Sequence, residues 1–132
     1  MLILPSSLRA QLIAEARAAY PSECCGLIEG TRQGDTIRAL ALHPTLNLAD
    51  DPAAGFEIDP AAHIRLRCVL RSTGRSVVGC YHSHPNGRPT PSPRDRACGC
   101  EEGFAWLIAA VAEEVTLAAF AGPDFRPIAL RA

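Results

Sequence analysis

The sequence has no lysine, no long basic run and a net charge of -1, so it lacks the electrostatic surface that binds nucleic acid. All 13 basic residues are arginine, which we interpret, together with the excess of alanine, as compositional bias. No apolar stretch is long enough to span a membrane. The first residues, MLILPSSLRAQL, have no basic segment before a very short apolar run, unlike a signal peptide. These absences predict a cytoplasmic protein that binds neither nucleic acid nor a membrane.

The cysteines lack the spacing of a structural zinc cluster, because no two of them are separated by two residues. In a reducing compartment we expect them to be mostly reduced and buried in the core. The six are Cys24, Cys25, Cys68, Cys80, Cys98 and Cys100.

What the sequence does contain is the apolar patterning of an ordinary globular domain. Its 132 residues are 48% hydrophobic, enough for a single core, and we expect residues 1–132 to form one domain. Apolar spacing predicts a helix over residues 7–19 and another that starts near Pro60 and ends before Gly74. It predicts strands over 24–30, 36–44, 76–84, 104–111, 114–122 and 126–130, and an irregular connection over 44–59. This mixture predicts an α/β (α+β) fold, a three-layer sandwich with a mixed central β-sheet flanked by helices.

Local signals refine the two helices. Ser6 or Ser7 is expected to cap the first helix, because serine hydroxyls accept hydrogen bonds from the first free backbone amides. In the second helix Ile64, Cys68 and Val69 share one side, which is the spacing of an apolar stripe.

Two histidines stand at the end of the strand predicted over residues 76–84. Residues two apart in a strand point to the same side, so His82 and His84 should project together, with Ser83 facing away. Pro85 then ends the strand. Imidazole nitrogens bind zinc well, and a catalytic zinc ion commonly takes three protein ligands and a water. Asp95 is the best candidate for the third ligand, because the turn residues between can bring it back to the histidines.

Simpler explanations of these residues remain open on spacing alone. The two histidines could serve packing or hydrogen bonding. Ser92-Pro93-Arg94-Asp95 also has the pattern of a helix start, with serine at the N-cap, proline at the first position and an acidic residue at the third. A helix start and a metal ligand are compatible roles for Asp95.

The segment from His82 to Asp95 resembles the His-x-His-x7-Ser-x2-Asp signature of the JAMM (MPN+) metallo-isopeptidases. Members of that family also carry a glutamate near the end of the first helix, and Glu23, within PSECCGLIEG, occupies that place. The segments 21–27 and 56–60 are similar to the small bacterial branch, and the resemblance covers essentially the whole chain. It implies the JAMM/MPN-like (cytidine-deaminase-like) version of the predicted sandwich.

The resemblance assigns a role to each matching residue. It implies that His82, His84 and Asp95 hold Zn²⁺. It also implies that Glu23 exchanges a proton with the attacking water and the leaving amine, and that Ser92 donates a hydrogen bond to the oxyanion. Both roles meet general requirements of amide hydrolysis.

Alternatives accompany these assignments. Glu29 is a competing base in the same segment as Glu23. From the residues alone, the favoured interpretation of Glu23 is a solvated acid on a loop after Pro21. The connection after Asp95 is short, so Cys98 or Cys100 could line the cleft.

The resemblance implies a zinc-dependent peptidase or isopeptidase, and in the small bacterial branch a substrate that is a ubiquitin-like sulfur-carrier protein with a Gly-Gly tail. Such a tail could add alongside an exposed strand next to the metal. One alternative is a non-catalytic protein-interaction scaffold of the same fold. Another is a peptidase acting on a cell-wall or tail-assembly peptide. A homodimer is compatible with the sequence.

Overall fold

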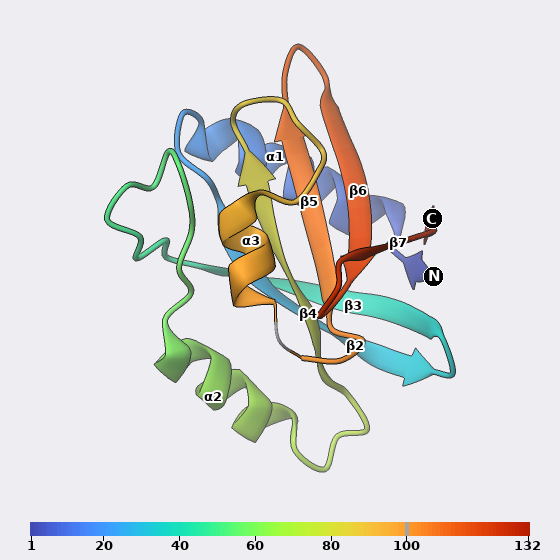
Figure 1. Ribbon diagram of the computed structural model, residues 1–132. Coiled ribbons are helices and arrows are strands. Elements are labelled where there is room, and N and C mark those ends of the chain that lie inside the picture. Colours follow the sequence, from blue (N-terminus) through green and yellow to red (C-terminus); the bar gives the residue numbers. More distant parts are fainter. Residues whose placement is uncertain (100) are drawn as a thin grey trace.

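The computed structural model describes residues 1–99 and 101–132, so Cys100, a candidate for the cleft wall, lies outside the described residues. The described chain alternates strands and helices around one sheet (Figure 1). The strands are β1 (Leu2–Ile3), β2 (Cys25–Gln33), β3 (Thr36–Thr45), β4 (Ser76–His84), β5 (Ala105–Val111), β6 (Val115–Ala121), β7 (Arg126–Ile128) and β8 (Leu130–Arg131), and the helices are α1 (Ser6–Ala19), α2 (Pro60–Leu70) and α3 (Pro93–Cys98).

The eight strands form one mixed sheet in the order β7-β6-β5-β4-β2-β3-β1-β8. The β4–β5, β1–β3 and β1–β8 pairs are parallel, and the other neighbours are antiparallel. The predicted α+β class with a mixed sheet is therefore confirmed. In the view of Figure 1, α1 lies behind the sheet and α3 lies in front of it.

The two faces of the sheet carry separate apolar cores. On one face Leu12 and Ala16 of α1 pack on Ile28, Tyr81 and Leu107 of the central strands. On the other face, which α2 covers, the core is made by Leu27, Leu70, Cys80, Phe104, Trp106, Ile108, Phe120 and Phe125. The central strands β4 and β5 are buried on both faces of the sheet. Their sequences are therefore nearly continuous apolar runs and do not alternate between apolar and polar residues.

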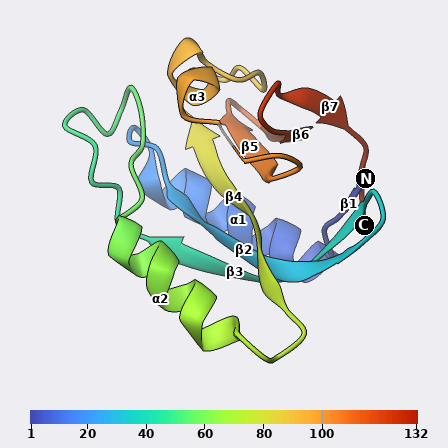
Figure 2. The same ribbon diagram turned by 60° about the horizontal axis from the view of Figure 1, so that its bottom comes forward.

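The C-terminal residues close the sheet rather than extend it. Residues 126–130 were expected to form one strand, but the structure divides them into β7, which pairs with β6, and β8, which pairs with β1. The two short strands lie at opposite ends of the strand order and are joined through Ala129. The sheet must therefore curve until its ends meet, and both chain termini lie side by side (Figure 2).

Other local expectations were wrong at helix surfaces. Pro5, not Ser6 or Ser7, is the N-cap of α1, and no side chain caps that helix. In α2, Ile64 and Val69 are well exposed, because the helix turns Leu66 and Leu70 toward the sheet instead. The helix also ends at Leu70, ahead of Gly74, which was expected to lie just beyond its end.

The cysteines divide between core and surface. Cys25 and Cys80 are buried as expected, but Cys68 and Cys98 are exposed. None of the helices formed by the described residues has the length and apolar character that crossing a bilayer requires.

Candidate metal centre

The end of β4 carries both histidines on the face of the sheet that α2 covers. His82 and His84 are buried, and their Nε2 atoms lie 3.0 Å apart. Asp95 Oδ2 is 3.1 Å from His82 Nε2 and 3.0 Å from His84 Nε2. The structure thus brings together the three residues that the spacing singled out as metal ligands.

The start of α3 presents Asp95 to the histidines. The Ser92 hydroxyl accepts a hydrogen bond from the Asp95 amide at 3.0 Å, and Asp95 Oδ2 accepts one from the Ser92 amide at 2.9 Å. This reciprocal capping box confirms the predicted helix start. One atom, Asp95 Oδ2, serves both the cap and the histidine pair, so the same side chain can cap the helix and bind a metal.

The geometry of this triad fits a tetrahedral zinc ion. Ligand atoms about 2.0–2.2 Å from such an ion stand roughly 3.3 Å from one another. The three atoms observed here are separated by 3.0–3.1 Å. His84 Nδ1 donates a hydrogen bond to the Arg88 carbonyl at 2.8 Å, so in the neutral ring the Nε2 lone pair points at the other two ligands. The donor set, two imidazoles and a carboxylate, is one that zinc prefers.

The charges of the triad also favour a cation. Burial raises the pKa of Asp95, but hydrogen bonds from His82 and His84 outweigh it and hold that pKa well below its usual value. Burial lowers the pKa of His82, although Asp95 opposes this. Burial also lowers the pKa of His84, yet hydrogen bonds to Asp95 and the Arg88 carbonyl raise it overall. An ionised carboxylate is thus buried beside two imidazoles, a combination that a metal ion neutralises.

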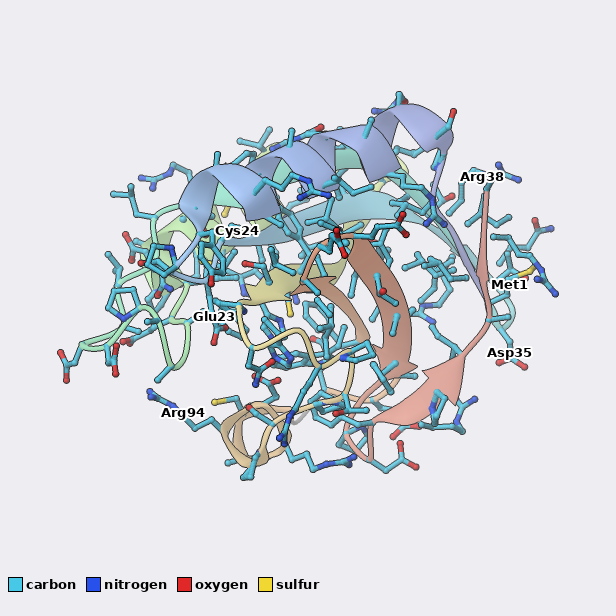
Figure 3. All side chains as sticks on the ribbon, turned by 90° about the horizontal axis from the view of Figure 1, so that it is seen from above. Met1, Glu23, Cys24, Asp35, Arg38 and Arg94 are labelled. Atoms are coloured by element: carbon cyan, nitrogen blue, oxygen red, sulfur yellow. The ribbon has the colours of Figure 1, made fainter. Side chains whose placement is uncertain are left out.

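Glu23 stands beside this triad, in the turn between α1 and β2. Its carboxylate and the two histidines offer ligand atoms that all lie within 4.8 Å of one another. Figure 3 shows Glu23 next to Cys24, on the side of the molecule where Arg94 of α3 lies and across the molecule from Met1. Burial raises the pKa of Glu23 to about 7, an effect that His84 partly offsets. A carboxyl group that titrates near neutrality can both accept and return a proton.

Two buried polar atoms here have no hydrogen-bond partner among the described residues: Glu23 Oε1 and His82 Nδ1. Buried polar atoms are rarely left unpaired without a functional reason. Glu23 Oε1 lies beside the triad and matches a site built to receive a ligand, whereas His82 Nδ1 is on the other side of its ring from the triad atom Nε2.

Phe56 is a site residue that sequence reasoning passed over. Its ring stacks on His82, with centroids 4.2 Å apart and planes 21° apart. Trp106 meets the same imidazole edge-on at 5.9 Å. Both aromatic rings line a cleft of about 220 Å³, to which Cys98 and Phe104 also contribute. Cys98 lines this cleft, and the favoured expectation of buried packing is wrong because Cys98 is exposed. Phe56 lies in a segment without regular structure, and the sequence signal there was the resemblance of residues 56–60 to the small bacterial branch, which assigned no role to the ring.

Glu29, the competing base, does not reach the metal centre. Its oxygens lie 2.9 Å from Arg75 Nη1 and 2.8 Å from His43 Nε2. The hydrogen bond from Arg75 lowers the pKa of Glu29, and the one from His43 adds to this effect against the opposing effect of burial. Glu29 is therefore an ion-paired structural carboxylate.

Comparison with known sequences gives a match over most of the chain. Residues 5–121 match the family described as prokaryotic homologues of the JAB domain. The chain is 31% identical to a desampylase of Haloferax volcanii, over 98% of this chain and 94% of that protein. It is 36% identical to a probable TtuB-protein conjugate cleaving protease of Thermus thermophilus, over 66% of this chain and 53% of that protein.

Solved structures of other proteins are similar to the fold of this chain. The solution structure of a protein from Desulfitobacterium hafniense has a TM-score of 0.85 at 27% identity, covering 98% of this chain and 91% of that one. A JAB1/MPN domain protein from Archaeoglobus fulgidus has a TM-score of 0.62 at 18% identity, covering 98% and 92%. At that identity, the likeness establishes a shared fold.

Proposed function

Because the chain belongs to the family of prokaryotic JAB-domain homologues and is a JAMM-type metalloisopeptidase, we propose that it cleaves conjugates of a ubiquitin-like sulfur-carrier protein with zinc bound at His82, His84 and Asp95. The observation that carries this proposal is the convergence of those three side chains on one point, with the Glu23 carboxylate beside them. When bound, zinc would lower the pKa of a water molecule and polarise the scissile carbonyl.

Glu23 is the proton carrier in this proposal. Its carboxylate takes one proton from the attacking water as the water oxygen bonds to the carbonyl carbon. It returns that proton to the nitrogen as the C–N bond breaks, which releases an amine and a carboxylic acid, and the acid then ionises by losing its own proton. The unpartnered Glu23 Oε1 and the pKa of about 7 support this role.

Ser92 stabilises the oxyanion. Its oxygen already accepts the Asp95 amide proton, which leaves the hydroxyl hydrogen free to donate to the negative charge that develops on the substrate oxygen. The capping contact fixes the serine before substrate arrives, so the donor needs little rearrangement.

The substrate class is supported by the cleft and by the relatives. An apolar cleft of about 220 Å³ begins at the two rings packed on His82, so a narrow, extended tail can lie beside the metal centre. One relative is a probable protease for TtuB–protein conjugates. We therefore expect a carrier protein that ends in Gly-Gly, joined to an amine such as that of cysteine.

The proposal is tested with zinc-loaded protein and a carrier whose Gly-Gly tail is joined to cysteine. Wild type should release cysteine, and Glu23→Ala should abolish release while retaining stoichiometric zinc. A carrier with Ala-Ala in place of Gly-Gly is the matched control and should be cleaved far more slowly. Tight binding of the carrier without any hydrolysis would favour the non-catalytic scaffold. Equal hydrolysis of unrelated peptides would contradict the carrier as substrate.

A further inference from the structure

The loop before α2 is organised by one side chain, Asn47, which uses all of its hydrogen-bonding groups. Its Nδ2 atom donates to the Glu23 and Gly55 carbonyls, both at 3.0 Å. Its Oδ1 atom accepts from the Ala49 amide at 3.0 Å and from the Glu57 amide at 3.1 Å. The bond to Glu23 links this loop to the turn that carries the carboxylate beside the metal centre.

The backbone around Glu23 is held from two sides. From the loop, the Pro52 carbonyl accepts the Glu23 amide at 2.7 Å. From β4, the Ser83 hydroxyl accepts the Cys24 amide at 2.8 Å, and the Ser83 amide donates to the Cys24 carbonyl at 3.1 Å. Ser83 belongs to the strand that carries the histidines, so these bonds connect Glu23 with the rest of the site.

The Glu23 carboxylate has few contacts of its own to determine its position. Its Oε1 atom has no hydrogen-bond partner among the described residues. The location of the carboxylate is therefore set mainly by its backbone, and Asn47 supplies the one side-chain bond to the Glu23 carbonyl that the structure shows. A displacement of about 1 Å at such a group can reduce a rate by roughly 100-fold.

Asn47 also locates the aromatic wall of the site. Phe56 lies between Gly55 and Glu57, whose carbonyl and amide are both bonded to Asn47. The Phe56 ring is the one that stacks on His82 at 4.2 Å. The same side chain is thus bonded to the backbone of the proposed base and to the residues flanking the ring against a metal ligand.

We propose that Asn47 is a positioning residue that holds Glu23, and with it Phe56, in register with the metal centre. This inference rests on the proposed function, in which Glu23 carries the proton. Asn47 touches neither the metal ligands nor the substrate in this role and acts through the backbone it binds.

Two substitutions separate the two halves of the Asn47 side chain. Asn47→Asp keeps an oxygen for the Ala49 and Glu57 amides but loses the donor to the Glu23 and Gly55 carbonyls. Asn47→Ala loses both and adds no charge. Asp51→Ala is the matched control, because Asp51 lies in the same loop and its side chain accepts one hydrogen bond, from the Ala53 amide at 3.3 Å.

We expect both Asn47 variants to lower kcat by roughly 10- to 100-fold, the effect typical of residues that orient a metal site. KM should change by less than about twofold, because the cleft is retained. The zinc content should equal that of wild type, and Asp51→Ala should keep wild-type kcat. In the Glu23→Gln background, Asn47→Ala should have no further effect on the residual rate. An additive loss in that background, or an unchanged kcat, would overturn the proposal.

A second measurement uses metal-free protein and needs no activity. The Glu23 amide should exchange its hydrogen at least about tenfold faster in both Asn47 variants than in wild type. The Ala49 and Glu57 amides should be faster only in Asn47→Ala. Exchange of the Glu23 amide at the wild-type rate in both variants would refute positioning by Asn47. Failure of wild type to cleave the carrier conjugate would instead refute the proposed function, with the exchange result still deciding what Asn47 holds.

Discussion

Two glutamates at opposite ends of one segment have opposite environments. Glu23 and Glu29 are each 7% exposed and lie six residues apart, before and within β2. Glu29 is paired with Arg75 and His43, and its pKa is lowered. Glu23 has an oxygen without a partner among the described residues, and burial raises its pKa to about 7.

The difference shows what distinguishes a structural carboxylate from a reactive one. Burial penalises the charged form of both, but it is the largest effect on the pKa of Glu23, whereas the hydrogen bond from Arg75 is the largest effect on the pKa of Glu29. At Glu29 two nitrogen donors stabilise the anion and occupy both oxygens. At Glu23 the two imidazoles of the metal triad lie near the carboxylate, and the orphan oxygen is available to bind a proton. Equal exposed fractions therefore accompany unequal chemistry.

Exchanging each carboxylate for its amide tests this contrast most strongly. With zinc bound and a carrier conjugate as substrate, Glu23→Gln should lower kcat by about 1,000-fold, within the range measured for lost general acid–base groups. Glu29→Gln should keep kcat within about twofold of wild type. Steady-state assays, run where circular dichroism shows both variants folded, measure the two effects. A comparable loss in the two variants would abolish the distinction.

The Ser92 hydroxyl is a second group, besides the Glu23 carboxylate, that is expected to act in catalysis. Ser92→Ala should lower kcat by roughly 100- to 1,000-fold, as loss of one oxyanion donor does. Ser92→Thr keeps both the hydroxyl and the N-cap of α3 and serves as the control, with most activity retained. Loss of the Ser92 cap alone should lower the free energy of unfolding by about 1 kcal/mol. Chemical denaturation should therefore be measured beside the assays, to show that Ser92→Ala is folded under assay conditions. If both variants lose activity equally, the hydroxyl is not the donor.

Zinc binding should raise the free energy of unfolding through the metal triad, and this gain should not depend on Glu29. At a free zinc concentration of 100 times Kd, the stabilisation should be about 2.7 kcal/mol. Wild type and Glu29→Gln should gain equally, whereas Asp95→Asn should gain much less because the triad loses its anion. Thermal unfolding with zinc and with a chelator gives the three values. An undiminished gain in Asp95→Asn would remove Asp95 from the ligand set.

The smallest effect concerns the stability that the Glu29 pair provides. Above pH 4.5, the ordinary value for this carboxyl, Glu29→Gln should lower the free energy of unfolding by about 1 kcal/mol, since Arg75 is half exposed and solvent screens it. The folded-state pKa is lowered, so the stabilisation is present above the unfolded-state pKa and is lost as the pH falls through the folded-state value. Urea unfolding from pH 7 to pH 3 should show the two proteins converging. A constant difference would contradict the ion pair.

Much of the metal centre was predictable because its signals are local. Alternation along β4 places His82 and His84 on one side, and the capping pattern of Ser92 and Asp95 places α3. These features depend on residues two or three apart, so their geometry follows from the backbone itself. The roles of those residues in catalysis stay predictions.

Helix faces and strand partners were less predictable. The stripe with Ile64 and Val69 has helical spacing, but the sheet takes the side with Leu66 and Leu70 instead. Residues 126–130 have the composition of one strand, yet their two halves pair with strands at opposite ends of the sheet. Both outcomes depend on where distant elements lie, which local spacing does not encode.

By itself, the sequence determined the class of the fold, the paired imidazoles at the end of a strand, and the helix start that carries Asp95. Only the tertiary structure decided which glutamate faces them. Glu29 finds Arg75 46 positions along the chain, while Glu23 is tied by Asn47 and left with an unpartnered oxygen. The physical reason is that burial and hydrogen bonding set the chemistry of a carboxylate, and both come from residues far away in sequence.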